Sequence, residues 1–388
     1  GRRSRPRTPT GGDFDVALHV PCSAEVDTLY YVDMNESITR PAAFGWVEKR
    51  LQEAALPTIA GNYNRNHIIS HEGRTYLVRV PIHGAPTLDI RLTPEWDVLP
   101  LLAAQGFAAP RLWYRDPQGR FAVHEFLPGQ SLDQLYPVRA VLPDWVAPVM
   151  AVQLAQLHQL DSVPFVAVCG MLAAAGDSCG VLLAAADYTE RFWRAQLVRY
   201  RQLYESLAVP PDPLASVRAE AAWLTPRAFV VCHCDTHRRN LIVAPDAEQL
   251  TLIDWELTTL ADPAYELAQH LHKIRYQPHQ EACFLAEYGK LFGNLPPAAE
   301  IAIYRRHEQI RSALIDTARM ADDIRRPGVT SAAQLALAVH LAPKLARVWE
   351  IWQVDGDPDV LEPAQLAALL YHATTSYEGY RPDLPGVR

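Results

Sequence analysis

A strand-loop-strand segment interrupts a chain that otherwise has a mainly helical pattern beyond Gly129. Residues 228–254 contain the apolar runs "AFVVCH" and "NLIVAPDAEQLTLID", which are typical of short strands. The segments around them place apolar residues at helical spacing. Histidine, aspartate and asparagine side chains lie in the loop between the two runs. The pattern therefore predicts β-structure that holds a polar loop inside a helical domain.

The first third of the chain has a different pattern. From Leu56 to Val80 it reads as a strand, a polar turn, a second strand, the turn "HEGR" and a third, β-branched strand. A helix is expected in "TPEWDVLPLLAAQGF", followed by a hairpin with its turn at "DPQG". We predict an α+β fold, with a small antiparallel sheet in residues 56–127 and a larger, mainly helical part in residues 128–388. Residues 1–55 form an N-terminal extension, expected to be partly disordered because it starts as a basic, proline-rich stretch.

The composition excludes several classes of protein. The chain has 388 residues, is 49% hydrophobic and carries a formal charge of −8 without long runs of like charge. A globular core is expected from this apolar content, and nucleic acid is not expected as a partner of an acidic chain. No run of about 18 apolar residues occurs, so we expect no membrane partner. Six scattered cysteines and the lack of a recognisable export signal favour a cytoplasmic protein.

Three side chains of the polar segment have the chemistry that phosphoryl transfer needs. A carboxylate at Asp235 can orient an attacking hydroxyl and accept its proton. The amide oxygen of Asn240 and the carboxylate of Asp254 are oxygen ligands of the kind that Mg²⁺ prefers. Because charge is spread over a loose transition state, positioning and electrostatics provide most of the catalysis. The order and spacing of the three residues predict a phosphotransfer site.

The residues of the loop also fit two other interpretations, a zinc site and a plain polar turn. Cys232, Cys234 and His237 offer soft metal ligands, but their spacing lacks the gap typical of zinc sites, and no partner pair follows. A polar turn with buried cysteines would account for most isolated matches of this kind. The presence of Asn240 and Asp254 at the expected positions favours phosphotransfer.

The same residues carry a family resemblance. "HCDTHRRNLIV" followed by "LIDWELTTLADPAYELA" resembles the catalytic and metal-binding segments of the aminoglycoside phosphotransferase and choline kinase-like family. "GNYNRNHIIS", "YLVRVP", "HEFLPGQSL" and "LAQLHQLD" are similar to other segments in the family's order, across roughly residues 56–275. The resemblance implies a bilobal protein-kinase-like fold. Its N-lobe would bind nucleotide, and its helical C-lobe would hold the catalytic loop and the substrate.

The resemblance also implies roles for single residues. Asp235 would be the catalytic base, His233 would brace the loop, and Asn240 and Asp254 would bind Mg²⁺. The implied nucleotide contacts, with ATP or GTP as co-substrate, are Arg79, Glu95, Gly61, Asn64 and the hinge residues Glu125, Phe126 and Leu127.

Arg79 departs from the family pattern, which often has a lysine at this position. Arginine keeps the charge, but its larger planar head makes it a different ligand for phosphate. Without the flanking motifs, Arg79 and Glu95 would be interpreted as a solvated strand charge and an acid in the first turn of a helix.

The acceptor is expected to contact the late helices. The candidate residues are Glu308, Arg311, Asp316 and Trp349. Acidic side chains and a tryptophan ring would suit an ammonium group, whereas arginine would suit a carboxylate or phosphate, as in a nucleoside antibiotic or sugar acid. Acids on helices are more often a solvated face, and tryptophans more often belong to the core.

The function that these observations favour is a small-molecule O-phosphotransferase for antibiotic inactivation or self-resistance. It would move the γ-phosphate of a nucleotide to a hydroxyl group. One alternative is a metabolic kinase of choline, a sugar or a similar small alcohol. Another alternative is a catalytically silent nucleotide-binding module. Arg79 and the glycine-poor loop at Gly61 favour this alternative. The sequence leaves a monomer and a dimer equally open.

Overall fold

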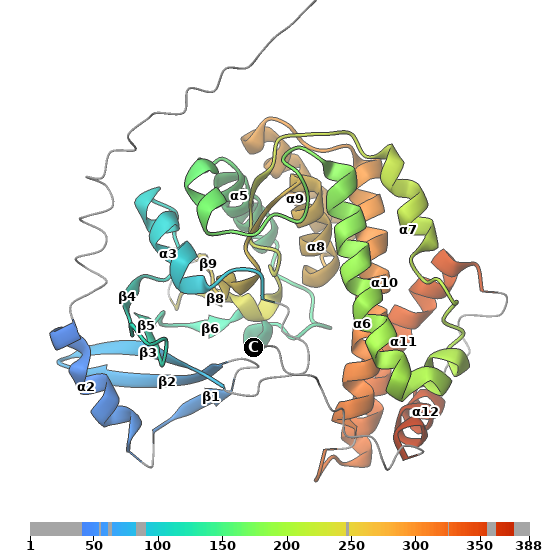
Figure 1. Ribbon diagram of the computed structural model, residues 1–388, viewed down its shortest axis with the longest axis horizontal. Coiled ribbons are helices and arrows are strands. Elements are labelled where there is room, and N and C mark those ends of the chain that lie inside the picture. Colours follow the sequence, from blue (N-terminus) through green and yellow to red (C-terminus); the bar gives the residue numbers. More distant parts are fainter. Residues whose placement is uncertain are drawn as a thin grey trace, which may run out of the picture.

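The computed structural model describes residues 41–53, 56–60, 64–82, 91–245, 248–324, 326–354 and 362–375. In these ranges the helices are α2 (Pro41–Leu51), α3 (Glu95–Ala104), α4 (Leu132–Leu135), α5 (Val146–His158), α6 (Ser178–Ser206), α7 (Ala215–Glu220), α8 (Pro263–Ile274), α9 (Pro278–Phe292), α10 (Ala298–Asp323), α11 (Ser331–Trp352) and α12 (Pro363–Thr375). The strands are β1 (Thr58–Ala60), β2 (Asn64–His71), β3 (Arg74–Pro81), β4 (Leu112–Arg115), β5 (Ala122–Glu125), β6 (Gln130–Ser131), β7 (Val230–Cys232), β8 (Leu241–Val243), β9 (Leu250–Leu252) and β10 (Thr259–Ala261). Figure 1 shows the sheet of β1 to β5 at one side of the molecule and the long helices α6, α10 and α11 at the other.

The small sheet has the strand order β1-β2-β3-β5-β4, and every neighbouring pair is antiparallel. The predicted turn between β2 and β3 is formed by Glu72 and Gly73, both with positive φ. Successive side chains of a strand point to opposite faces. Val78 is therefore buried in the core of the small lobe, while its neighbour Arg79 faces the other way, toward α3.

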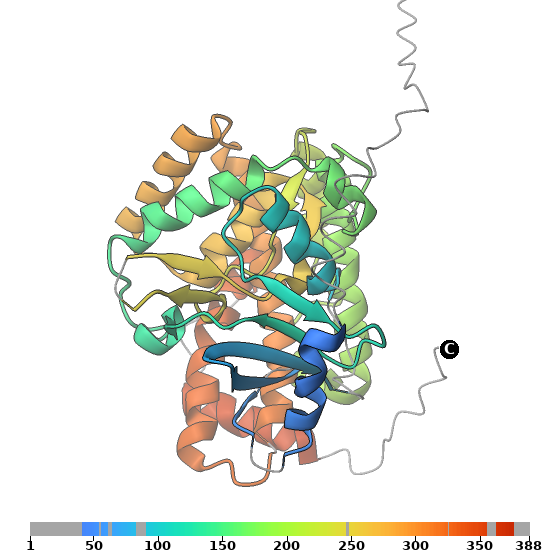
Figure 2. The same ribbon diagram turned by 90° about the vertical axis from the view of Figure 1, so that its left-hand side faces the viewer.

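Helix α2 covers one face of this sheet. Phe44 stacks on Tyr114 at a ring distance of 5.2 Å, and Val47 is fully buried with Val78. Figure 2 shows α2 lying against the strands. The end of the predicted N-terminal extension thus forms part of the small lobe's core, while residues 1–40 lie outside the described ranges.

Helix α3 connects the two lobes. Its Leu99 and Leu102 are buried in the core of the large lobe. Just before the helix, the backbone N–H of Leu92 donates to the Glu256 carbonyl at 2.9 Å, and Thr93 Oγ1 donates to the Thr258 carbonyl at 2.8 Å. These bonds fix the start of α3 on the turn that follows β9.

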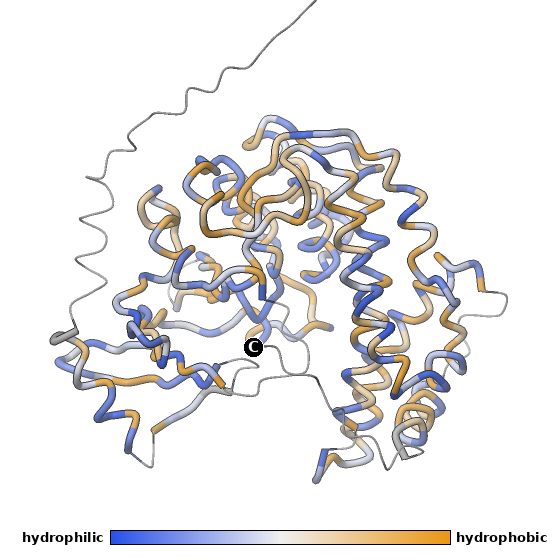
Figure 3. Tube along the Cα trace, in the orientation of Figure 1, coloured by the Kyte–Doolittle hydropathy of each residue, from blue (hydrophilic) through white to orange (hydrophobic). Residues whose placement is uncertain are grey.

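The large lobe packs its helices around two small antiparallel sheets, β6-β8-β9 and β7-β10. Apolar and polar residues alternate along its long helices (Figure 3), and the apolar side chains form one continuous core. The β-structure predicted for residues 228–254 is present as β7, β8 and β9. The polar residues predicted for the site, from His233 to Asp254, lie at the ends of these strands.

Candidate active site

The loop after β7 is held by His233. Its Nδ1 accepts a hydrogen bond from the Asp235 backbone N–H at 3.2 Å, and its Nε2 donates to the Ile253 carbonyl at 3.1 Å. Burial lowers the pKa of His233 to about 4, so the ring is neutral and can accept at one nitrogen while it donates at the other. Cys234, the next residue, has a φ of 60°, which turns the chain sharply. The Asp235 carboxylate is presented by this turn.

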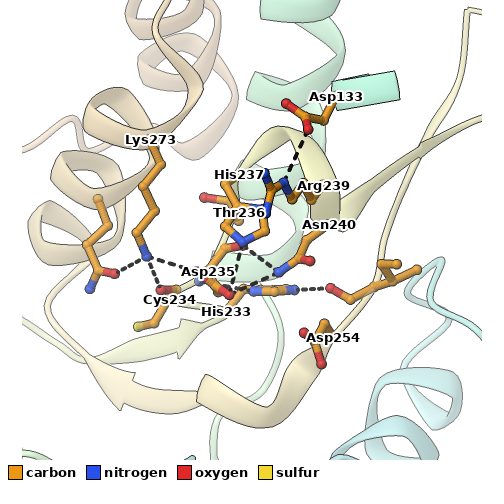
Figure 4. A network of polar contacts seen from close by, with 12 residues as sticks. Asp133, His233, Cys234, Asp235, Thr236, His237, Arg239, Asn240, Asp254 and Lys273 are labelled. Atoms are coloured by element: carbon orange, nitrogen blue, oxygen red, sulfur yellow. Dashed lines mark hydrogen bonds and ion pairs between the residues drawn. The ribbon is translucent and has the colours of Figure 1, made fainter. Parts of the chain in front are cut away.

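Three side chains surround the Asp235 carboxylate (Figure 4). Lys273 Nζ lies 3.0 Å from Oδ1, and Asn240 Nδ2 donates to Oδ2 at 3.0 Å. His237 Nε2 lies 3.4 Å from Oδ2. Burial alone would raise the pKa of Asp235, but Lys273 and His237 outweigh it and hold that pKa well below its usual range. The carboxylate therefore stays ionised and can accept a hydrogen bond from a hydroxyl group.

The strand register places Asn240 and Asp254 next to each other. Leu241 of β8 pairs with Leu252 of β9, and the Ile253 N–H donates to the Asn240 carbonyl at 3.0 Å. Because the Asn240 amide nitrogen faces Asp235, its side-chain oxygen is the atom that can bind a cation. Asp254 has a left-handed backbone, with φ 69°. For a residue other than glycine this conformation is strained, and it is commonly found at functional sites.

Arg79 is surrounded by three carboxylates. Its guanidinium pairs with Glu95, with Asp254 Oδ1 at 3.1 Å and with Glu256 Oε1 at 3.3 Å. The Trp255 backbone N–H donates to Glu95 at 3.2 Å, which ties α3 to the same turn. Burial raises the pKa of Asp254 and of Glu256, and the neighbouring carboxylates raise both further. One guanidinium thus faces three acids, and a divalent cation bound by the oxygen ligands here would relieve the remaining negative charge.

Of the other predicted nucleotide residues, Asn64 contacts this cluster. Asn64 is buried in β2 and its side-chain amide donates to Glu256 at 2.9 Å, which links the start of β2 to the cluster. Glu125 ends β5, exchanges two hydrogen bonds with Arg111, and is followed by Phe126 and Leu127 on the way to the large lobe. Gly61 lies outside the described residues.

Gly129 fixes the path of the chain just beyond Leu127. Its φ is 133°, and a Cβ atom at this position would lie 2.1 Å from the Val243 carbonyl oxygen. Only glycine fits, because both the backbone conformation and the close approach to β8 exclude a side chain.

The predicted acceptor residues are engaged in other contacts. Glu308 pairs with Arg311 at 2.9 Å, and Asp316 pairs with Lys344 of α11. Trp349 Nε1 donates to the Leu207 carbonyl at 2.8 Å, beyond the end of α6. None of these contacts involves Asp235, but the charge of Asp235 acts on Arg311 and that of Lys273 acts on Glu308. A contact of the four candidates with the acceptor stays a prediction.

Helix α8 supplies two residues that the sequence did not indicate. Lys273 contacts Asp235, and Glu266 accepts from the Cys234 N–H at 2.8 Å and from Thr236 Oγ1 at 3.4 Å. Glu266 is fully buried, and burial raises its pKa to about 7. The loop is thus held from behind by the same helix whose last turn reaches the Asp235 carboxylate.

The geometry gives little support to the interpretation of Cys232, Cys234 and His237 as a zinc site. Among the described residues, His158, Cys232 and Glu266 are the group whose potential ligand atoms lie within 4.8 Å of one another. Cys234 and His237 do not belong to it. Burial raises the pKa of the Cys232 thiol well above its ordinary value, which disfavours the thiolate that metal binding needs.

Residues 56–301 match the model of the phosphotransferase enzyme family, known as APH. The chain belongs to this family. The match covers the small lobe and the catalytic loop, and it confirms the family resemblance drawn from the motifs.

Comparisons with single proteins agree with this assignment. The chain is 29% identical over 198 residues to an N-acetylmuramate/N-acetylglucosamine kinase of Caulobacter vibrioides, and the alignment covers 48% of this chain and 52% of that protein. The chain thus spans about half the length of that relative.

Two solved structures show the same fold. A choline kinase from Streptococcus pneumoniae has a TM-score of 0.53 and 18% identity, covering 79% of this chain and 98% of that one. A thermostable mutant of an aminoglycoside phosphotransferase has a TM-score of 0.52 and 15% identity, covering 80% and 98%. The predicted bilobal kinase-like α+β fold is confirmed. None of the helices in the described ranges is long and apolar enough to cross a membrane.

Proposed function

We propose that this protein transfers the γ-phosphate of ATP or GTP to a hydroxyl group of a small molecule. The observation that carries the proposal is the environment of Asp235: an ionised carboxylate held by Lys273 and Asn240 beside Asp254. In this role Asp235 accepts a hydrogen bond from the acceptor hydroxyl and aims its oxygen at the γ-phosphorus. As the new O–P bond forms, the bond from that phosphorus to the β–γ bridging oxygen breaks, ADP or GDP leaves, and Asp235 takes the hydroxyl proton. His233 keeps the loop in place.

The nucleotide would lie between the lobes. Glu95 forms an ion pair with Arg79 and so would orient its guanidinium toward the phosphate oxygens. Before the nucleotide binds, the charge of Arg79 compensates the charges of Asp254 and Glu256. The backbone of Phe126 and Leu127 would contact the base. Asn240 and Asp254 would hold Mg²⁺, which neutralises phosphate charge when bound.

The acceptor that we favour is a sugar-like alcohol. The similarity to an N-acetylmuramate/N-acetylglucosamine kinase supports this class. The ion pairs of Glu308 with Arg311 and of Asp316 with Lys344 speak against a polycationic acceptor, because both acids already have cationic partners. The second candidate is inactivation of an antibiotic that carries a sugar or nucleoside hydroxyl. The fold shared with an aminoglycoside phosphotransferase is compatible with it.

A panel of acceptors tests the proposal. N-acetylglucosamine, N-acetylmuramate, choline, an aminoglycoside and a nucleoside antibiotic are each incubated with the protein, ATP or GTP, and Mg²⁺, and ADP or GDP release is measured. We expect release that depends on a sugar-like acceptor and disappears in Asp235→Asn. Nucleotide binding without release for any acceptor would instead support a silent nucleotide-binding module.

A further inference from the structure

Basic side chains gather where the end of α8 meets α10 and α11. Lys273, in the last turn of α8, contacts Asp235. Its neighbour His272 lies 3.0 Å from Ser312 Oγ on α10, and Lys344 of α11 pairs with Asp316, one turn further along α10. The three helices therefore bring their polar faces together next to the catalytic loop.

Helix α11 turns a basic face toward this junction. His340, Lys344 and Arg347 are spaced four and three residues apart, so they lie on one side of the helix. Arg139, from the segment after α4, donates to the Val339 carbonyl at 3.4 Å and so adds its charge beside the same helix.

The carboxylates at the junction are already paired. Asp235 pairs with Lys273, Glu308 with Arg311, and Asp316 with Lys344. A set of arginines remains, which we call the cationic patch: Arg139, Arg275 and Arg347. Across the described part of the chain, no carboxylate forms an ion pair with any of the three.

The charges of the junction act on one another. Burial lowers the pKa of Arg275, Arg347 and Arg139 lower it further by repulsion, and Asp316 acts to raise it. Burial lowers the pKa of His272 to about 3, with Glu308 acting to raise that pKa and Lys344, Lys273 and Arg347 acting to lower it. Lys273, which contacts Asp235, and Arg347 on α11 thus both act on the same imidazole. The cationic patch therefore lies beside the helix end that reaches Asp235.

We propose that the acceptor carries a carboxylate or phosphate group besides its reacting hydroxyl, and that the cationic patch, Arg139, Arg275 and Arg347, binds this group. The proposal rests on the proposed function, because it assigns the acceptor class of the same site. Guanidinium groups can bind carboxylates and phosphates with two hydrogen bonds, and a bound anion would relieve the repulsion between arginines that have no ion-pair partner. The patch would hold the anionic end of the acceptor while Asp235 holds its hydroxyl.

The test compares three ligands of matched shape: D-glucose, D-glucuronate and D-glucose 6-phosphate. The nucleotide site is first saturated with a non-hydrolysable ATP analogue and Mg²⁺, so that added anions report only on the acceptor side. Binding is measured by calorimetry and by the shift of the melting temperature. The proteins are the wild type, Arg275→Gln with Arg347→Gln, and Arg326→Gln, an exposed arginine paired with Asp323 at 2.8 Å.

We expect at least one charged sugar to bind the wild type and Arg326→Gln about tenfold or more tightly than glucose does. A gain of this size corresponds to one additional charged hydrogen bond. Which sugar binds tells carboxylate from phosphate. The double variant should lose this preference, and its shift with the ATP analogue shows whether it is folded. If the double glutamine variant does not fold, Arg275→Lys with Arg347→Lys replaces it. This lysine variant keeps both positive charges and should keep a preference for the charged sugars.

Equal binding of glucose and both charged sugars to the wild type would overturn the proposal. A preference that survives in the folded double glutamine variant would overturn it as well. A failure of the proposed function would give another result. In that case the charged sugars would bind through the cationic patch, but no acceptor would cause ADP release.

Discussion

Lys273 Nζ lies 3.0 Å from Asp235 Oδ1, and it also donates to the Cys234 carbonyl at 2.9 Å. One side chain from the end of α8 thus holds both the Asp235 carboxylate and the backbone of its loop. Glu266, two turns earlier on the same helix, holds the loop from behind through the Cys234 N–H. The position of Asp235 consequently depends on how α8 docks against the loop.

Lys273→Met should shift the acidic limb of the pH profile of kcat/KM to higher pH. Lys273 lowers the pKa of Asp235, so removing its charge raises that pKa, and the carboxylate is then protonated at a higher pH. Lys290→Met is the matched control, because Lys290 is exposed on α9 and pairs with Glu287. An acidic limb that stays in place in Lys273→Met would show that Lys273 does not control the ionisation of Asp235.

Arg79→Lys should raise the KM for the nucleotide by about tenfold or more. A lysine keeps the charge but cannot bridge Glu95, Asp254 and Glu256 at once, and each charged hydrogen bond lost is worth about 1.5–3 kcal/mol. The control is Arg74→Lys in the same strand, where Arg74 is exposed and lies 4.8 Å from the Trp113 ring centre. A KM that is unchanged in Arg79→Lys would exclude Arg79 from nucleotide binding.

Asp254→Asn should weaken activation by Mg²⁺. In the wild type, burial and the charges of Glu95 and Asp235 raise the pKa of Asp254 despite the opposing charge of Arg79, so its protonation competes with the metal as the pH falls. The Mg²⁺ concentration for half-maximal activity should therefore rise as the pH falls, and it should be high at every pH in the variant. Asp187→Asn on α6 serves as the control, since Asp187 pairs with Arg218. Identical Mg²⁺ titrations for wild type and Asp254→Asn would argue against a metal ligand at this position.

Glu266→Gln should change how stability depends on pH. The pKa of Glu266 is raised to about 7 in the folded protein, against about 4.3 in an unfolded chain. The folded state therefore binds the proton more tightly, and the stability from this group is complete below about pH 4.3 and lost as the pH rises to about 7. Relative to the variant, the wild type should lose about 3 kcal/mol of unfolding free energy across this range.

Urea unfolding of wild type and Glu266→Gln at several pH values measures this difference, with the exposed Glu287→Gln as control. A difference between wild type and Glu266→Gln that is constant with pH would mean that Glu266 titrates in the folded protein as it does in the unfolded chain.

The sequence predicted the parts of the site that depend on neighbouring strands. Asn240 and Asp254 meet because β8 and β9 form a local hairpin, and that pairing follows from two short apolar runs. Glu256 could have been noticed, since it follows Asp254 by two residues in "DWE". Its contact with Arg79, however, joins residues that are far apart in the chain.

The contacts between helices could not be predicted in the same way. Lys273 is one of many charged residues at the end of an amphipathic helix, and only the docking of α8 brings it to Asp235. Likewise, Asp316 has the pattern of a solvated helix face, whereas Lys344 of the next helix pairs with it. Helical periodicity tells which face is buried but not which helix will cover it.

Acceptor-dependent ADP release by the wild type and by Asp235→Asn, with nucleotide affinity measured in parallel, tests the central claim most directly. A positioned general base contributes about 100-fold or more to the rate. We predict a loss of at least this size in Asp235→Asn while the affinity for the nucleotide is retained. A variant that still transfers phosphate at the wild-type rate would contradict the role of Asp235 and the phosphotransfer mechanism built on it.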